Sequence, residues 1–275
     1  MSGADRISPT AHYTGYVWAR NGLSHPQLAS TEGRLMFGSL HPWMLLSRAL
    51  GGATLEAYLL ARHRAIDALL ERAIEQHGVA QVIEVASGLS PRGWRFSQRY
   101  GERLTYVEGD LPEMATRKRA ALARMGSCGE RHRVVELDAL AERGPRSLGK
   151  AAEELDPQRG LAIITEGLLG YLPSVDVLAL WRRFARTLGA FPQGRYISDL
   201  HLGGVQSAQV RAFRVFLSAV VRGPVHLHFS HAAEAEAALR EAGFRSASVT
   251  AAASVIGADR DPGSRLARIL EASTL

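Results

Sequence analysis

Carboxylates recur in this sequence at the ends of its short apolar runs. The residue types in these runs predict five β-strands, at 81–86, 104–108, 133–137, 161–165 and 195–198. The acids on or just beyond the strand ends are Glu84, Glu108, Asp110, Asp138, Glu166 and Asp199. Ligands of an open parallel sheet bind outside the carboxyl ends of its strands. A ring of carboxylates at that edge suits a ligand with hydroxyl groups and a positive charge, and it repels phosphates.

The loop after the first strand restricts the ligand further. It reads Ala-Ser-Gly-Leu-Ser-Pro-Arg-Gly from Ala86 to Gly93, whereas a dinucleotide fold needs G-x-G-x-x-G to hold pyrophosphate at the helix start. Only Gly88 stands where the backbone must approach a ligand. An acid about 20 residues beyond such a loop, here Glu108 or Asp110, is placed to bind ribose hydroxyls. S-adenosylmethionine is a cation that carries ribose and no phosphate, and we expect it as the cofactor.

The elements that position these acids alternate in type along the chain. Helical periodicity is present at 54–76, 91–100, 112–125 and 175–188, between the apolar strands. This alternation indicates an α/β fold, in which a buried parallel sheet has helices on both faces. After Asp199 we expect a helix at 205–221, a helix at 232–242 and further extended segments at 224–229, 244–250 and 267–272.

Four segments together resemble the leucine carboxyl methyltransferase family, which includes O-methyltransferases similar to those of polyketide tailoring. The resemblance spans about Leu55 to Asp199. Its segments are Ala61-Arg62 with Ile66-Asp67 and the stretch 82–93, then 106–112 with Lys118, then 135–140, and lastly 165–173, which is the most specific.

The resemblance implies a single Rossmann-like class I methyltransferase domain. Its sheet would be mostly parallel and seven-stranded, with helices on both faces and an N-terminal helical cap. We expect one domain over residues 1–275, with the cap at 1–50, the cofactor-binding core at 51–200, and an insertion helix with C-terminal strands at 201–275.

The resemblance also implies roles for individual residues of the cofactor site. Arg62 and Gly88 would hold the methionine part, Arg62 by pairing with its carboxylate. Asp110 would bind the ribose, with Glu108 packed beside it. The other cofactor-binding residues that we expect are Glu84 and Ala86 of the first motif, Asp138 and Ala139 flanking the adenine, and Glu166 facing the methionine end.

Two departures from the family pattern concern the first loop. Ala86 and Ser90 stand beside Gly88, where many methyltransferases have more glycine, and Pro91 replaces the acid that often precedes the loop arginine. These departures leave the path of the loop and any contact by Arg92 open.

The acceptor side offers fewer signals. His201, just past the fifth strand, is a candidate catalytic base because imidazole has a suitable pKa for proton removal, and a loop histidine is the alternative. Tyr13, Tyr16 and Trp18 would either roof a substrate pocket or pack the cap onto the sheet. We expect no metal, because His226, His228 and His231 lack the supported set of three or four converging ligands that a metal site needs. The sequence does not identify the acceptor.

Composition excludes several classes of protein. The 275 residues carry a net charge of +6, but the basic residues are almost all scattered arginines, without the basic clusters and interleaved aromatics of a nucleic-acid surface. The first twenty residues contain no apolar signal region, and no apolar run approaches the roughly 18 residues that span a bilayer. One cysteine, Cys128, permits no internal disulfide. We therefore expect a cytoplasmic protein with no nucleic-acid or membrane partner, whose oligomeric state the sequence does not reveal.

These observations predict an S-adenosylmethionine-dependent O-methyltransferase. Its acceptor would be a carboxyl or hydroxyl group, and a small molecule is favoured over a protein C-terminus because the aromatic cap suits a compact apolar ligand. The alternatives are a protein C-terminal carboxyl methyltransferase, a dinucleotide-dependent oxidoreductase, and a non-catalytic protein that retains the fold and the cofactor.

Overall fold

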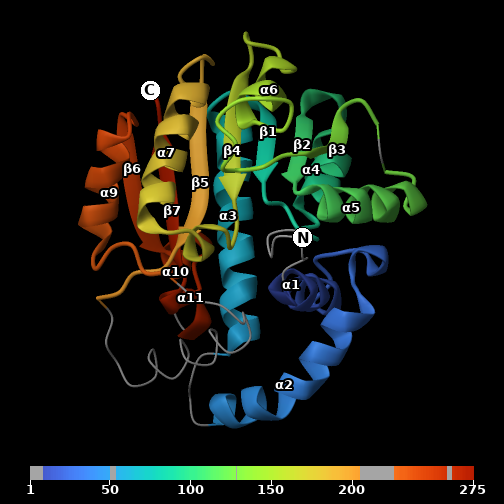
Figure 1. The fold of residues 1–275 in the computed structure, drawn as a ribbon. Helices are drawn as coiled ribbons and strands as arrows, with labels where there is room; N and C mark the ends of the chain where they lie inside the picture. The colour runs from blue at the N-terminus through green and yellow to red at the C-terminus, as the bar shows by residue number, and fades with distance from the viewer. Residues whose placement is uncertain (1–8, 50–53, 128, 205–225, 259–261) are drawn as a thin grey trace.

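The structure is a computed structural model, and it describes residues 9–49, 54–127, 129–204, 226–258 and 262–275. Seven strands form one sheet in the order β3-β2-β1-β4-β5-β7-β6 (Figure 1). The first five are parallel, and β7 runs antiparallel to both β5 and β6. The strands are β1 (Val79–Val85), β2 (Thr105–Asp110), β3 (His132–Glu136), β4 (Gly160–Thr165), β5 (Gly194–Leu200), β6 (Ser246–Ala251) and β7 (Arg268–Ser273). The mostly parallel seven-stranded sheet is therefore confirmed.

Helices cover both faces of the sheet because successive strand residues point to opposite sides. On one face Val82 and Tyr106 belong to a core with the helices α3 (Leu55–Gln76) and α4 (Arg92–Tyr100), and α10 (Ala252–Ile256) and α11 (Pro262–Leu266) pack on α3. On the other face Ile83 and Val107 belong to a second core, with α6 (Leu148–Glu153), α7 (Ser174–Leu188) and α9 (Ala232–Glu241). A smaller cluster joins α5 (Pro112–Arg124) to β3. Figure 1 shows α6, α7 and α9 in front of the sheet.

The N-terminal cap consists of two helices. α1 (Pro9–Arg20) and α2 (Thr31–Ala49) are joined through the short helix η1 (Pro26–Leu28), and α2 extends away from the sheet (Figure 1). α1 crosses the loop that follows β1, since a Cβ added at Gly15 would lie 3.2 Å from the Cβ of Leu89. The cap therefore lies against the loop in which the sequence predicts a ligand.

The expected extended segment at 224–229 differs from the structure. Its described part, 226–229, forms one isolated bridge, from Phe229 to Leu202. The main-chain N–H of His226 donates to the carbonyl of Gly170, and a ring nitrogen of His228 lies 2.9 Å from the carbonyl oxygen of Leu169. Hydrogen bonds to the loop after β4 thus replace sheet pairing. The expected helix at 205–221 and Cys128 lie outside the described residues. No helix in the described ranges combines the length and apolarity required to cross a membrane.

Candidate active site

The loop between β1 and α4 is joined to the end of the neighbouring strand. Ala86 and Gly88 have positive φ angles of 55° and 51°, so the chain turns sharply on either side of Ser87. The N–H of Ser87 donates to the carbonyl of Gly109, and the N–H of Gly88 donates to Asp110 Oδ2 at 2.6 Å. Among the described residues, a Cβ added at Gly88 would meet only Ala11, at 3.6 Å. The backbone at Gly88 is therefore open to close approach.

Asp110, the last residue of β2, can accept more hydrogen bonds than the protein donates to it. Its Oδ1 accepts the N–H of Leu111 at 2.8 Å, and Oδ2 accepts the N–H of Gly88. Burial raises the pKa of Asp110 above its ordinary value, and these two N–H groups offset that effect only in part. A carboxylate oxygen has two acceptor sites, so each oxygen can still accept another hydrogen bond. The two hydroxyl groups of a ribose match that capacity.

Glu108 lies beside Asp110 but is enclosed by protein. Its side chain is 0% exposed and forms ion pairs with Lys118 of α5 and with Nε2 of His132, the latter at 2.6 Å. Burial alone would raise the pKa of Glu108, but the charges and hydrogen bonds of Lys118 and His132 outweigh it and lower the pKa. A side chain at Gly93 would collide with this carboxylate, so α4 packs directly on it. Glu108 thus supports the start of α4, the helix that follows the loop.

Glu84 requires a correction to the expected set of cofactor ligands. Its side chain is 1% exposed. Oε1 accepts from Arg92 Nη1 at 2.6 Å, and Oε2 accepts from the hydroxyl of Tyr106 at 2.7 Å. Because both oxygens have protein donors and no open side, Glu84 holds the start of α4 rather than a ligand.

Arg92, whose contact the sequence left open, is the centre of a buried ion network. Its side chain is 0% exposed and meets three carboxylates from three parts of the fold. Nε pairs with Asp67 Oδ1 at 2.7 Å, Nη1 with Glu84, and Nη2 with Glu166 Oε2 at 2.6 Å. Burial alone would lower the pKa of Arg92, but these carboxylates raise it well above its ordinary value. The signal in the sequence was Asp67, a carboxylate on the apolar side of a helix.

Arg62 and Glu166 join this network at the ends of β4 and β5. Arg62 Nε lies 3.0 Å from Glu166 Oε1, and Nη1 lies 3.1 Å from Asp199 Oδ2. His63, which the sequence analysis missed, contacts Glu166 Oε2 through Nδ1 at 2.9 Å. Burial would raise the pKa of Glu166, but His63, Arg92 and Arg62 hold it well below its ordinary value. Arg62 and Glu166 are therefore paired with each other, and each is already charge-compensated.

His201 follows β5 and is half-buried. Its Nε2 lies 3.0 Å from the hydroxyl oxygen of Tyr58, a residue of α3 that the sequence analysis did not single out. Burial and the charge of Asp199 raise the pKa of Tyr58, so its hydroxyl stays protonated at neutral pH. The candidate base is thus held by a protein hydrogen bond on one ring nitrogen.

The aromatic residues of α1 make packing contacts. Tyr13 is buried and its ring stacks on Phe37 of α2 at 6.0 Å, while Tyr16 contacts the same ring at 5.4 Å. Trp18 is buried against His63, with 4.5 Å between ring centroids. Tyr13 and Tyr16 therefore pack α1 on α2, and Trp18 packs α1 on α3.

Asp138 and Ala139 form a turn just beyond β3. Asp138 Oδ1 accepts the N–H of Leu140 at 2.9 Å, and the N–H of Asp138 donates to the carbonyl of Arg146. The carbonyl of Ala139 accepts a hydrogen bond from Arg183 of α7. Among the described residues Asp138 Oδ2 has no hydrogen-bond donor, so it is available to an amino group.

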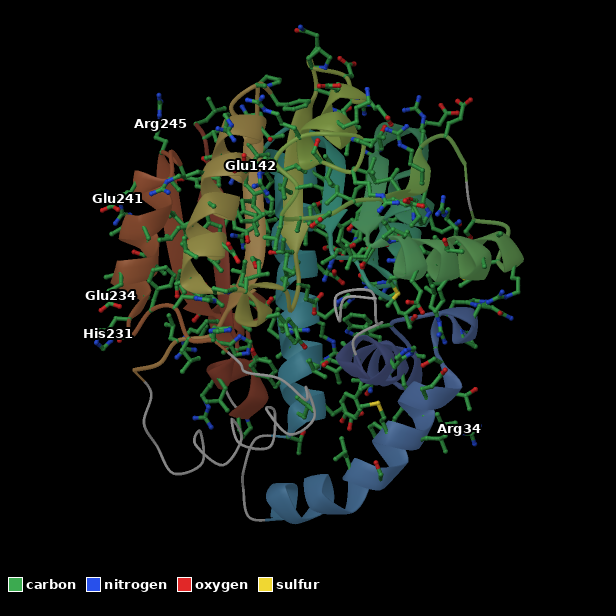
Figure 2. The ribbon with its side chains drawn as sticks, viewed as in Figure 1. Arg34, Glu142, His231, Glu234, Glu241 and Arg245 are labelled. Atoms are coloured by element: carbon green, nitrogen blue, oxygen red, sulfur yellow. The ribbon has the colours of Figure 1, made fainter. Side chains whose placement is uncertain are left out.

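The histidines near the C-terminus serve other contacts. His228 lies between the hydroxyl of Ser174 and the carbonyl of Leu169, at 2.9 Å from each. Figure 2 shows His231 with Glu234 and Glu241 at the outer side of the molecule near α9. In the described part of the chain, no group of three or more His, Cys, Asp or Glu side chains could hold a metal ion.

Solved structures share this fold. A protein of the DUF574 family from Streptomyces avermitilis superposes with a TM-score of 0.65 at 16% identity, covering 99% of each chain. PigF with SAH superposes with a TM-score of 0.51 at 20% identity, covering 76% of this chain and 54% of that one. At these identities the likeness concerns the fold alone.

Sequence relatives give closer matches over shorter lengths. Two curated relatives carry the name "Putative S-adenosyl-L-methionine-dependent methyltransferase". The one from Mycolicibacterium gilvum is 41% identical over 96 residues, 35% of this chain and 30% of the relative. The one from Mycobacterium ulcerans is 36% identical over 116 residues, 42% of this chain and 36% of the relative. The chain thus spans about a third of the length of the curated relatives it matches.

The family match covers both the buried ion network and the loop between β1 and α4. Residues 40–185 match the model of the leucine carboxyl methyltransferase family. That range contains Arg62, Gly88, Asp110 and Glu166, which the structure places along one edge of the sheet. Because the match extends over more than half of the sequence, the chain belongs to the leucine carboxyl methyltransferase family.

Proposed function

We propose that this protein is an S-adenosylmethionine-dependent O-methyltransferase that acts on a carboxyl or hydroxyl group of a small-molecule acceptor. The observation that carries the proposal is the 2.6 Å hydrogen bond from the N–H of Gly88 to Asp110 Oδ2. In a dinucleotide fold, the N–H groups at this position hold pyrophosphate. Here the N–H is taken by a carboxylate, whose charge repels phosphate and whose remaining lone pairs suit ribose hydroxyls. This disfavours the oxidoreductase alternative.

The donor and acceptor groups along the edge fit the parts of the cofactor. Asp110 would accept from the ribose diol, and Asp138 Oδ2 would accept from the adenine amino group. The guanidinium of Arg62 has five N–H donors, and its ion pairs with Glu166 and Asp199 do not use them all, so it can also bind the methionine carboxylate. The cofactor supplies an activated methyl group on a sulfonium. The residues of this chain orient the two reactants, and for an in-line transfer orientation supplies much of the rate.

A ligand comparison with a matched pair of glycine variants tests the proposal. We expect S-adenosylhomocysteine and S-adenosylmethionine, but neither NAD nor NADP, to raise the melting temperature of the wild type. Gly88→Val should abolish S-adenosylhomocysteine binding in calorimetry, because its side chain fills the space the cofactor needs.

Gly101→Val is the control, because Gly101 has nearly the same φ, 53°, with nothing within 4 Å of an added Cβ among the described residues. It also places a valine at a positive φ, without obstructing the site, so it should bind normally. Unchanged affinity in Gly88→Val would place the cofactor elsewhere, and a response to NAD would support the oxidoreductase.

The acceptor group is distinguished by its need for a base. A carboxylate is nucleophilic at neutral pH, whereas an alcohol or phenol must lose a proton during attack. With a panel of small carboxylic acids, phenols and a peptide C-terminus, a base-labile product and an active His201→Ala variant identify carboxyl transfer. Hydroxyl transfer is identified by activity that rises as the pH increases through the range in which an imidazole loses its proton. This activity must also disappear in His201→Ala while the affinity for the cofactor is unchanged. Transfer to the peptide alone contradicts the small-molecule acceptor.

A further inference from the structure

One arginine of α7 is buried without an acidic partner. Arg183 as a residue is 7% exposed, and none of the ion pairs in the described part of the chain includes it. Nη1 donates to the main-chain carbonyl of Ala139, and Nε is buried with no hydrogen-bond partner among the described residues. Removing a guanidinium from water without a counter-charge is unfavourable.

The neighbouring arginines of the same helix do not share this arrangement. Arg182 and Arg186 are exposed, and only Arg183 turns toward the sheet. In Figure 1 the chain between β3 and α6 crosses the face of the sheet on which α7 lies. Arg183 therefore connects a helix packed on β4 and β5 to a segment that follows β3, which lies three strands away from β4 in the sheet order.

The segment that Arg183 holds is the turn beside the proposed adenine site. β3 is the edge strand of the sheet, so this turn has a neighbouring strand on one side only. On that side the N–H of Leu137 donates to the carbonyl of Asp110 at 2.8 Å. Within the turn, Asp138 Oδ1 and the Asp138 carbonyl accept from Leu140 and Ala141, which fixes its shape but not its position. Arg183 supplies a further attachment, from the helix α7 on the face of the sheet that this segment crosses.

We propose that Arg183 is a positioning residue for the adenine side of the cofactor site. It holds the carbonyl of Ala139, and through it places Asp138 Oδ2 where an adenine amino group can donate to it. This role rests on the proposed function, since it assumes that the turn at 138–139 receives the adenine.

The test measures affinity for two ligands that share adenosine. Calorimetry with S-adenosylhomocysteine and with 5′-methylthioadenosine should show that Arg183→Ala weakens both by the same factor, about tenfold. The matched control Arg182→Ala should bind both like the wild type. Arg183→Lys, which keeps a cationic donor, should recover part of the affinity.

A double-mutant cycle separates positioning from general stability. If Arg183 acts through Asp138, Arg183→Ala should weaken binding much less in an Asp138→Ala background than in the wild type. Wild-type affinity in Arg183→Ala with a lowered melting temperature would show a structural role only, and additive losses in the cycle would show that Arg183 does not act through Asp138; either result overturns the inference.

Two further outcomes keep the inference distinct from the proposed function. If the wild type binds neither adenosine ligand, the proposed function fails and this inference with it. If the wild type binds both and Asp138→Ala weakens them while Arg183→Ala does not, the function stands and the inference fails. Should Arg183→Ala not fold, the same cycle is built with Arg183→Lys, and additivity there has the same meaning.

Discussion

Two carboxylates on β2 lie two residues apart and face the same side of the sheet, yet they differ in their partners, in their burial and in the direction of their pKa shifts. Glu108 is enclosed and paired with Lys118 and His132, and its pKa is lowered. Asp110 is half-buried and held by two backbone N–H groups, and its pKa is raised. Glu108 is paired directly with cations, whereas Asp110 is bonded to backbone N–H groups and feels Lys118 only at a distance.

This contrast divides the acids of the whole edge into two groups. Glu84, Glu108, Glu166 and Asp67 share cations that other elements bring to them, so the fold depends on their charge. Asp110 and Asp138 accept from local N–H groups and retain free lone pairs. The paired acids therefore stabilise the carboxyl ends of the strands, whereas Asp110 and Asp138 remain able to bind a ligand.

The largest effect should come from removing the shared cation of the first group. Arg92→Met leaves three buried carboxylates without their common partner, and breaking a buried pair in this way costs about 3–5 kcal/mol. Arg99→Ala, on the same helix, removes an exposed pair with Glu71 and should cost less than about 1 kcal/mol. Urea unfolding measures both. Equal midpoints for the two variants would contradict the importance of the buried network.

The second effect separates the two acids of β2. Asp110→Ala should weaken S-adenosylhomocysteine binding at least tenfold, because a hydrogen bond to a charged group is worth roughly 1.5–3 kcal/mol. Glu108→Gln should mainly lower the unfolding free energy, because it leaves Lys118 buried beside a neutral amide. Calorimetry and urea unfolding on both variants test the division. Normal binding in Asp110→Ala with weakened binding in Glu108→Gln would reverse the two roles.

The pH dependence of binding and of stability should separate in the same way. Asp110 has a raised pKa, so affinity for S-adenosylhomocysteine should fall as the pH drops through a value above the ordinary 3.8, while the protein is still folded. Asp67 and Glu166 have lowered pKa values, so their contribution to stability is full above the unfolded pKa values, near 4. It is lost as the pH falls from there through the lower folded values.

Calorimetry measures the affinity and circular dichroism measures the folded fraction between pH 7 and pH 3.5. The affinity should begin to fall at a higher pH than the folded fraction. Asp110→Asn, which cannot titrate, should bind weakly with no such acid decline. Loss of affinity and of fold at one common pH would show that both acid groups belong to the same structural unit.

The smallest effect concerns the strain in the loop itself. Ala86 has a φ of 55°, which costs an L-residue roughly 1–2 kcal/mol. Ala86→Gly relieves this strain but increases the entropy of the unfolded chain, so the net gain in stability should be below about 1 kcal/mol. Cofactor affinity should not change. A loss of stability in thermal unfolding would show that the methyl group of Ala86 makes a packing contact of its own.

Much of the fold followed from local patterns in the sequence. The strands of the sheet and their alternation with helices were predicted, because hydrophobic periodicity suffices to define them. The described part of the segment at 224–229, residues 226–229, is not the expected extended strand, because alternation of polar and apolar residues does not reveal the partner. His226 and His228 bond to Gly170 and Leu169, and only Phe229 forms a bridge, with Leu202.

The roles of the individual acids could be predicted only in part. Glu84 and Asp110 both occur as acids at strand ends, and nothing local distinguishes them. What separates them is Arg92, which reaches Glu84 from another element. Such a pairing depends on how α3 and α4 pack over the sheet. For the same reason His63 and Tyr58, both on α3, could not be assigned to the site before the helix was placed.

The hydrogen bond from Gly88 to Asp110 also has a consequence for the rates of ligand exchange. The loop at 86–91 is joined to β2 by hydrogen bonds within the protein, so a ligand that binds there need not order it. Ordering a loop on binding reduces affinity, and a preorganised loop avoids this loss. Association should then vary little among cofactor analogues, and their differences in affinity should reside in their dissociation rates. The analogue with the longest residence time should accordingly be the one whose ribose hydroxyl groups donate to Asp110 and whose amino group donates to Asp138.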